Sequence, residues 1–112
     1  MSTAPVGEVD PAEVQALAAQ GAVLLDVRER VEWAAGHIPG AVHLPLLALD
    51  PSAVPTDRIV VAVCRSGNRS GKAARLLAAA GRDMRNLAGG MQAWAEQGGA
   101  VVRDDGAPGS VA

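Results

Sequence analysis

The sequence predicts a protein of the α/β class, with a mostly parallel β-sheet covered by helices. Three observations support this fold class. Short apolar runs alternate with helix-like segments along the chain, and strands that alternate with helices form parallel sheets. The run Ile59–Val63 is apolar at every position and mostly β-branched, as expected for a strand covered on both faces. Glycine, proline or polar residues separate the segments from one another.

The first elements carry clear start and stop signals. A short edge strand is expected at 7–9. Asp10 and Pro11 are typical of a helix N-cap and first turn, and Glu13 adds the pattern of a capping box. Apolar side chains at helical spacing then continue up to Gly21, a residue type that commonly ends helices. These signals predict a helix over 11–20.

The remaining elements follow from the same kinds of signal. Apolar runs of strand length predict strands, and segments rich in alanine and leucine before a glycine predict helices. Residues 51–57 are polar and predict a loop. In chain order we expect strand 22–27, helix 29–35, strand 41–44, helical turn 46–49, strand 59–63, helix 70–80, strand 84–87 and helix 90–97.

The chain is long enough for one domain. Its 112 residues can form one core but not two. Residues 103–112 show no periodicity, so we expect a single domain at 1–103 and a flexible C-terminal tail at 104–112. The sequence holds no Phe or Tyr, so small aliphatic side chains must fill the interior. The two aromatic residues, Trp33 and Trp94, are expected to be core anchors.

Composition argues against several functional classes. The net charge of −2 and the pI of about 5.6 give no general attraction for nucleic acids or membrane surfaces. One cysteine cannot form an intramolecular disulfide, and with two histidines it does not supply a structural zinc site. No metal or cofactor is therefore expected. No run approaches the ~20 apolar residues of a membrane span, and residues 1–10 lack the pattern of a signal peptide, so a cytoplasmic location is expected.

The most informative segment surrounds the only cysteine, Cys64. It follows the strongest predicted strand and precedes the best predicted helix, and ligands of parallel sheets bind beyond the carboxyl ends of strands. Every residue from 65 to 72 has a backbone N–H, because none is proline. Gly67 allows the loop to curl, so several of these donors can point inward and form an anion-binding nest.

The charges in this segment favour a reactive thiolate. Arg65, Arg69 and Lys72 are cations, and no acidic residue lies between Cys64 and Arg82. Cations and a helix N-terminus lower the pKa of a cysteine below its reference of ~8.5. The competing interpretation is an inert, buried core cysteine, since free cysteine is often buried. Without a second cysteine, any covalent intermediate on Cys64 must be discharged by an external acceptor.

Three blocks of sequence resemble one known family. The segment 64–70, CRSGNRS, is similar to the active-site loop of rhodanese-homology domains. The block LDVRE at 25–29, with Trp33 and GHIPGA at 36–41, resembles the N-terminal signature of that family. The block NLAGGM at 86–91, with Trp94, resembles its C-terminal signature. The three blocks stand in family order, and the resemblance covers about residues 7–102.

The resemblance implies a fold, a reaction and its partners. The fold would be a sheet of about five mostly parallel strands with helices on both faces. Cys64 would take the outer sulfur of a small anionic donor such as thiosulfate or a low-molecular-weight persulfide. A thiol or cyanide acceptor would then remove it. Arg65 and Arg69 would orient the donor. The bound sulfur would be held by the loop residues Arg65, Ser66, Gly67, Asn68, Arg69 and Ser70.

Three alternatives stay open. Phosphatases of this fold need five residues between the cysteine and the arginine, whereas four separate Cys64 from Arg69, which favours a site for one sulfur atom. The domain could instead be a persulfide carrier that serves a protein partner in a sulfur relay. It could also be a catalytically silent member of the family, although a retained cysteine argues against that.

The other notable residues have simpler interpretations. Asp26 and Arg28 are expected to form a structural pair, with a supporting role behind the active loop as the alternative. His37 is expected to be a hydrogen-bonded turn residue, and His43 a strand residue without a special role. The pair Gly89 and Gly90 is expected to serve a turn and a helix start rather than a phosphate site.

Overall fold

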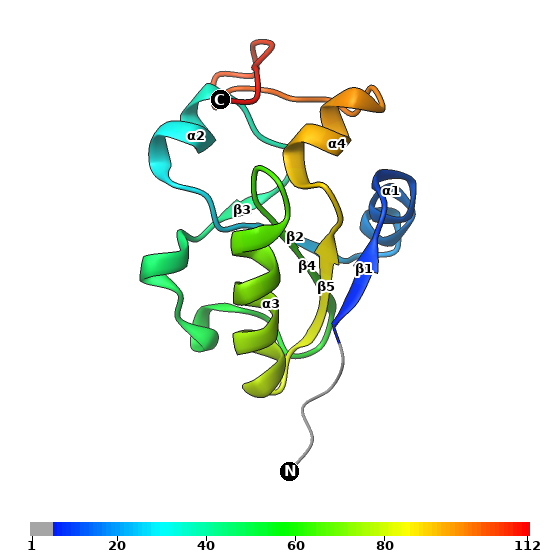
Figure 1. Ribbon diagram of the computed structural model, residues 1–112, viewed down its shortest axis with the longest axis vertical. Coiled ribbons are helices and arrows are strands. Elements are labelled where there is room, and N and C mark those ends of the chain that lie inside the picture. Colours follow the sequence, from blue (N-terminus) through cyan, green and yellow to red (C-terminus); the bar gives the residue numbers. More distant parts are fainter. Residues whose placement is uncertain (1–5) are drawn as a thin grey trace.

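A five-stranded parallel sheet forms the centre of the molecule (Figure 1). The computed structural model describes residues 6–112. The strand order is β1-β5-β4-β2-β3, and every pairing between these strands is parallel. The predicted fold class is therefore confirmed. The strands are β1 (Gly7–Val9), β2 (Val23–Asp26), β3 (Val42–His43), β4 (Ile59–Val63) and β5 (Asp83–Leu87).

The helices lie close to their predicted positions. Asp10 caps the first helix, and its carboxylate accepts a hydrogen bond from the Glu13 amide in a complete capping box. The polar loop predicted at 51–57 contains a short 3-10 turn that begins after Asp50. The helices are α1 (Pro11–Ala19), α2 (Arg30–Ala35), α3 (Asn68–Ala79) and α4 (Gly90–Glu96), with 3-10 turns η1 (Leu46–Ala48) and η2 (Pro51–Ala53).

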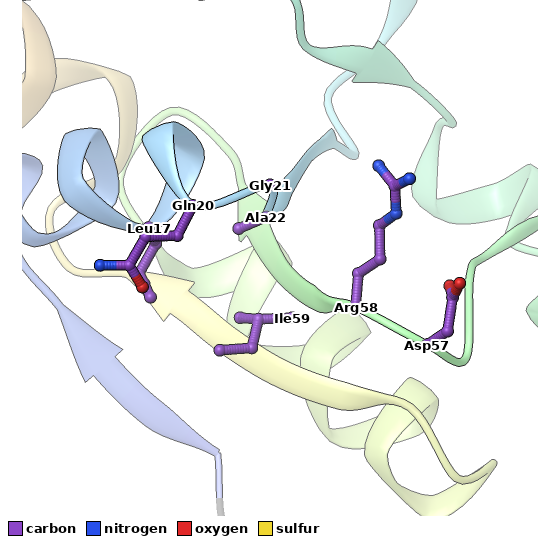
Figure 2. Close-up of a pocket in the computed structure, with 7 residues that line it drawn as sticks. All are labelled: Leu17, Gln20, Gly21, Ala22, Asp57, Arg58 and Ile59. Carbon is purple, nitrogen blue, oxygen red and sulfur yellow. The ribbon is translucent and has the colours of Figure 1, made fainter.

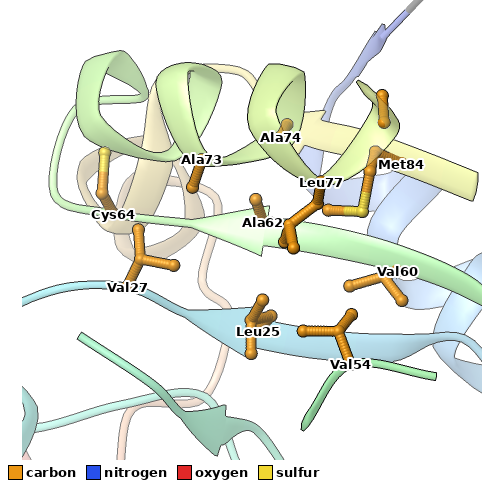
Figure 3. Close-up of a cluster of buried hydrophobic side chains, with 11 residues drawn as sticks. Leu25, Val27, Val54, Val60, Ala62, Cys64, Ala73, Ala74, Leu77 and Met84 are labelled. Atoms are coloured by element: carbon orange, nitrogen blue, oxygen red, sulfur yellow. The ribbon is translucent and has the colours of Figure 1, made fainter. Parts of the chain in front are cut away.

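Each face of the sheet carries its own apolar layer. On one face, α3 packs its small side chains Ala73 and Ala74 against β4 and β5, and Cys64 lies at the end of this layer (Figure 3). On the other face, Val14 of α1 and Met91 and Trp94 of α4 cover the sheet. Helices thus cover both faces, as expected. None of the helices in the described part of the chain is long and apolar enough to cross a membrane.

The two tryptophans have different environments. Trp94 is a core anchor as predicted, with 5% of its surface exposed. The same prediction is wrong for Trp33, which is half-buried and lies outside both apolar layers. Its ring stacks on those of His37 and His43, with centroid distances of 3.6 and 4.8 Å. The short helix α2 does not lie on the sheet, so its tryptophan packs against the two imidazoles instead.

The C-terminal segment, predicted as a flexible tail at 104–112, folds back onto the domain. It passes from the end of α4 across to α2 (Figure 1). The Ser110 amide donates to the Ala35 carbonyl at 2.9 Å, and Val102 pairs with His37 and with Pro108 as isolated β-bridges. Main-chain hydrogen bonds hold the segment, and these leave no side-chain periodicity in the sequence. The domain boundaries themselves stay a prediction.

Gly36 provides a test of this packing. An added Cβ at this position would lie 2.6 Å from the Ser110 carbonyl oxygen and from Val101 Cγ1. We expect Gly36→Ala to cost about 1–3 kcal/mol of stability through this overlap. In hydrogen exchange, the Val102 and Ser110 amides should be protected in the parent protein and lose protection in the variant. Rapid exchange of both amides in the parent would contradict the packed segment.

Candidate active site around Cys64

The sulfur of Cys64 lies inside a ring of hydrogen-bond donors. Cys64 directly follows β4, and α3 begins four residues later, at Asn68. The Gly67 amide donates to Sγ at 3.0 Å, and the Ser70 hydroxyl lies 3.2 Å from it. The amides of Ser66 and Ser70 also act on the sulfur as donors. Main-chain N–H groups therefore face the sulfur, as the sequence predicts.

The carbonyl groups of Cys64 and Arg65 explain why one of these amides, that of Ser66, faces inward. The Met91 amide donates to the Cys64 carbonyl at 2.8 Å, and the Gln92 amide donates to the Arg65 carbonyl at 3.1 Å. In a trans peptide group the C=O and the N–H point in opposite directions. Since the first turn of α4 holds these two carbonyls, the N–H groups of the same peptides point away from α4, and that of Ser66 reaches the sulfur.

Gly90 allows this close approach of α4 to the loop. It has a φ of +57°, and an added Cβ would overlap the Cys64 carbonyl oxygen and lie 2.6 Å from the Arg65 carbonyl carbon. The glycine pair therefore serves a helix start, as expected, and it also brings the α4 amides within reach of the loop carbonyls.

The electrostatics of the thiol combine two opposing effects. Cys64 has no exposed surface, and burial alone would raise the pKa of its thiol. Hydrogen bonds from the Ser70 hydroxyl and from the amides of Ser70, Gly67 and Ser66 outweigh burial, so the pKa lies below its ordinary value. The sequence predicts that the loop cations and the helix end favour the thiolate. Hydrogen-bond donors in contact with the sulfur lower its pKa most, and attraction to Cys64 adds to the bond from Glu32 in raising the pKa of Arg69.

The loop cations are largely occupied by other partners. Arg69 forms a bidentate pair with Glu32 of α2 at 2.6 and 2.7 Å. The hydrogen bond from Arg69 lowers the pKa of Glu32 to about 2, although burial opposes it, and the same bond raises the pKa of Arg69. The Arg65 side chain donates to the Ala112 carbonyl at 2.9 Å, and Lys72 is exposed. Two of the three cations are thus fixed in place near the loop.

Asp26 and Arg28 form a fully buried ion pair beside the site. Arg28 Nε lies 3.0 and 3.1 Å from the two carboxylate oxygens of Asp26, and Arg28 Nη2 donates to one of them at 2.8 Å. Arg28 Nη2 also donates to the Gly36 carbonyl at 2.7 Å. Within residues 6–112, the side-chain hydrogen bonds of this pair do not reach the Cys64 loop, so the pair links the end of β2 to the end of α2.

The two histidines have structural contacts. His37 is buried in the turn and donates from Nδ1 to the Trp33 carbonyl at 2.9 Å, as expected for a turn histidine. His43 lies in β3, as expected, and donates from Nε2 to the Arg28 carbonyl at 2.8 Å. Among residues 6–112, no three His, Cys, Asp or Glu side chains gather as a metal site would require.

Sequence reasoning missed two residues that contact the loop, Glu32 and Asn86. Glu32 is far from Cys64 in the sequence, and its role depends on where α2 lies. Asn86 of β5 contacts Ser70 and also donates to the Gly67 carbonyl at 3.1 Å. One signal could have identified Asn86, since it is a polar residue near the carboxyl end of an apolar strand.

An open hollow elsewhere on the surface is unrelated to Cys64. It has a volume of about 480 Å³ and lies between the end of α1 and the segment leading into β4, with Arg58 and Asp57 at its rim (Figure 2). The hollow lies at the amino ends of β2 and β4, whereas Cys64 lies at the carboxyl end of β4. The two are therefore at opposite ends of the parallel strands.

Comparison with known proteins places this geometry in a family. Residues 10–97 match the family described as "Rhodanese-like domain". The chain belongs to the rhodanese family. The match includes β2, the Cys64 loop and α4, the three regions that carry the resemblance in the sequence. The chain is therefore a rhodanese-like domain homologous to small sulfurtransferases.

Three individual relatives support this membership. The chain is 41% identical to a protein named sulfurtransferase from Allochromatium vinosum, over 90% of this chain and 99% of that protein. It is 38% identical to thiosulfate sulfurtransferase GlpE of Pseudomonas fluorescens, over 77% of this chain and 82% of that protein. It is also 40% identical to the uncharacterized protein slr1261 of Synechocystis, over 92% of this chain but only 60% of that protein.

A solved structure confirms the fold. The crystal structure of a rhodanese-related protein from Thermoplasma volcanium superimposes with a TM-score of 0.79 at 28% identity. The superposition covers 86% of this chain and 97% of that one. The rhodanese fold expected from the resemblance is therefore confirmed.

Gly90→Ala tests how α4 orients the loop. Steric overlap with the loop carbonyls adds to left-handed strain, so we expect a loss of about 2–4 kcal/mol in the free energy of unfolding. Gly81→Ala is the control, because Gly81 also has a positive φ but nothing lies within 4 Å of an added Cβ. It should cost only about 1–2 kcal/mol. Equal losses in denaturant unfolding would contradict the proposed close approach.

Proposed function

We propose that this rhodanese domain is a sulfurtransferase that carries sulfur as a persulfide on Cys64. One observation carries the proposal: the only thiol in the chain lies among converging main-chain and hydroxyl donors, with a pKa below its ordinary value. A thiolate is the reactive form of cysteine, and donors that stabilise one negative sulfur can stabilise a persulfide in the same loop.

The proposed reaction has two displacement steps. The Cys64 thiolate attacks the outer sulfur of thiosulfate, a new S–S bond forms, and sulfite leaves with the electron pair of the broken bond. The enzyme then holds a Cys64 persulfide anion. In the second step, an acceptor thiolate or cyanide attacks the outer sulfur and the Cys64 thiolate leaves. Because the chain has no second cysteine, it cannot discharge the persulfide by forming an internal disulfide.

The surroundings of the loop support an anionic donor. Arg65, Arg69 and Lys72 all lie within nine residues of Cys64, and Glu32 neutralises only Arg69. Their positive field attracts small anions such as thiosulfate. Since Cys64 has no exposed surface, a donor reaches the sulfur only when the loop opens. The loop residues Arg65, Ser66 and Asn68 are themselves exposed, so a donor can approach the loop from solvent.

A protein partner is the second candidate, favoured by the apolar surface next to the loop. A hollow of about 260 Å³ lies between Arg69 and the η1 turn, lined by Val27, Pro45 and Leu46. Leu47 at its rim is 97% exposed. Leu47 and the apolar lining of the hollow are continuous, and contiguous apolar surface marks interaction sites. A persulfide carrier that receives sulfur from another protein would use this surface for docking.

Intact mass spectrometry tests the proposed function. Incubation with thiosulfate should add one sulfur atom to the protein, and cyanide should remove it. Cys64→Ser should keep the fold, because the substitution is nearly isosteric, and should take up no sulfur. No adduct with thiosulfate, with a low-molecular-weight persulfide or with a protein persulfide would refute the proposal. Fast loading from a protein persulfide alongside slow loading from thiosulfate would favour the carrier.

A further inference from the structure

A chain of hydrogen bonds connects the buried Cys64 to the exposed Glu8 on the edge strand of the sheet. Ser70 Oγ lies 3.2 Å from Cys64 Sγ and 2.6 Å from Asn86 Oδ1. Asn86 Nδ2 donates to the two carboxylate oxygens of Glu8 at 3.0 and 3.1 Å and to the Gly67 carbonyl at 3.1 Å. Ser70 has no exposed surface and Asn86 has 3%. These hydrogen bonds join three elements of the fold, because Ser70 lies in α3, Asn86 in β5 and Glu8 in β1.

The partners of Asn86 fix the orientation of its amide. Glu8 and the Gly67 carbonyl are both acceptors, so they require the NH₂ end of the amide. The carbonyl end must then face Ser70. A flipped amide would place its oxygen against the oxygens of Glu8 and Gly67, and its NH₂ group would lose both acceptors.

This orientation creates a competition for one hydrogen. A serine hydroxyl has a single hydrogen to donate, and both Asn86 Oδ1 and a Cys64 thiolate accept it. In the thiol form all bonds are compatible, since Sγ–H donates to Ser70 and Ser70 donates to Asn86. In the thiolate form, donation to the sulfur leaves the Asn86 oxygen unpaired in a buried site, which is costly.

We propose that Asn86, oriented by Glu8 and the Gly67 carbonyl, is a positioning residue that holds the Ser70 hydroxyl hydrogen and thereby limits its donation to the sulfur of Cys64. The amides of the loop still favour the thiolate, and Asn86 restrains only the contribution of the hydroxyl. A more basic thiolate is the stronger nucleophile, because nucleophilicity falls as the pKa of a thiol falls. The restraint therefore keeps the ionised sulfur more nucleophilic, while the loop amides maintain its ionisation.

Other charged groups near Cys64 could also change the pKa of its thiol, so their effects must be distinguished from that of Asn86. Glu8 lies on β1 and Arg65 in the loop. Arg69 on α3 pairs with Glu32 on α2, and the Asp26–Arg28 pair lies at the carboxyl end of β2. Among these, Glu8 is the one bonded to Asn86. Its charge could act on the thiol directly, without Asn86, so the test includes a variant that removes this charge and keeps an acceptor.

The test is the pH dependence of Cys64 alkylation by iodoacetamide. In Asn86→Leu the hydroxyl is free to donate to the thiolate, so the midpoint should fall by about one pH unit. The plateau rate at high pH should fall about threefold, because the thiolate is less basic. A loosened loop would have the opposite effect, with a higher midpoint and a faster plateau. Glu8→Gln is the matched control and should leave the midpoint close to that of the parent.

A double-mutant comparison shows whether Asn86 acts through Ser70. Adding Asn86→Leu to Ser70→Ala should leave the midpoint of the single Ser70→Ala variant unchanged. An unchanged or raised midpoint in Asn86→Leu alone, an equal shift in Glu8→Gln, or a further shift in the double variant would each overturn the inference. If Asn86→Leu does not fold, the ¹³Cγ resonance of Asn86 in the parent protein gives the same information. It should titrate with the alkylation midpoint, and a resonance that does not respond would contradict the inference.

The role of Asn86 in sulfur transfer rests on the proposed function, but the experiment that tests Asn86 does not. Alkylation reports on the thiolate without any sulfur donor. A protein that fails to form a persulfide but shows the expected midpoints would refute the proposed function alone. A protein that loads sulfur normally but lacks the expected shifts would refute the role of Asn86 alone.

Discussion

The orientation of the peptide groups between Cys64 and Gly67 is the constraint on which the site depends. Amides from the first turn of α4 hold the carbonyls of Cys64 and Arg65, and Asn86 holds that of Gly67. With the Arg65 carbonyl held by α4, the Ser66 amide of the same peptide group faces the sulfur, next to the amides of Gly67 and Ser70. The parallel sheet makes this possible because the carboxyl ends of β4 and β5 lie side by side, so the loop after one strand meets the helix after the other.

This constraint explains how a buried thiol can remain ionisable. Taking a thiolate out of water is costly, and a cysteine at the end of an apolar layer would ordinarily stay protonated. Donors already fixed in place compensate for the lost water without further ordering. The arginines contribute less directly, since Arg69 is paired with Glu32 and Arg65 with the Ala112 carbonyl. Their charges contribute to the electrostatic field outside the loop.

The sequence predicted most of the fold and the place of Cys64 between a strand and a helix. Local signals were sufficient there: the capping box at Asp10, the apolar strand at 59–63 and a glycine-containing loop after it. Contacts between distant segments were not predictable. Glu32 reaches Arg69 only because α2 lies above the loop, and Asn86 reaches Ser70 only because β5 is the neighbour of β4. The segment 104–112 was predicted as flexible because main-chain hydrogen bonds leave no pattern in side chains.

An experimental structure of the protein after reaction with thiosulfate tests the central claim most directly. The account predicts an outer sulfur on Cys64 within hydrogen-bonding distance of the amides of residues 66, 67 and 70, while the Cys64 and Arg65 carbonyls keep their bonds to α4. An outer sulfur directed away from these amides, with the peptide groups of the loop reversed, would contradict it.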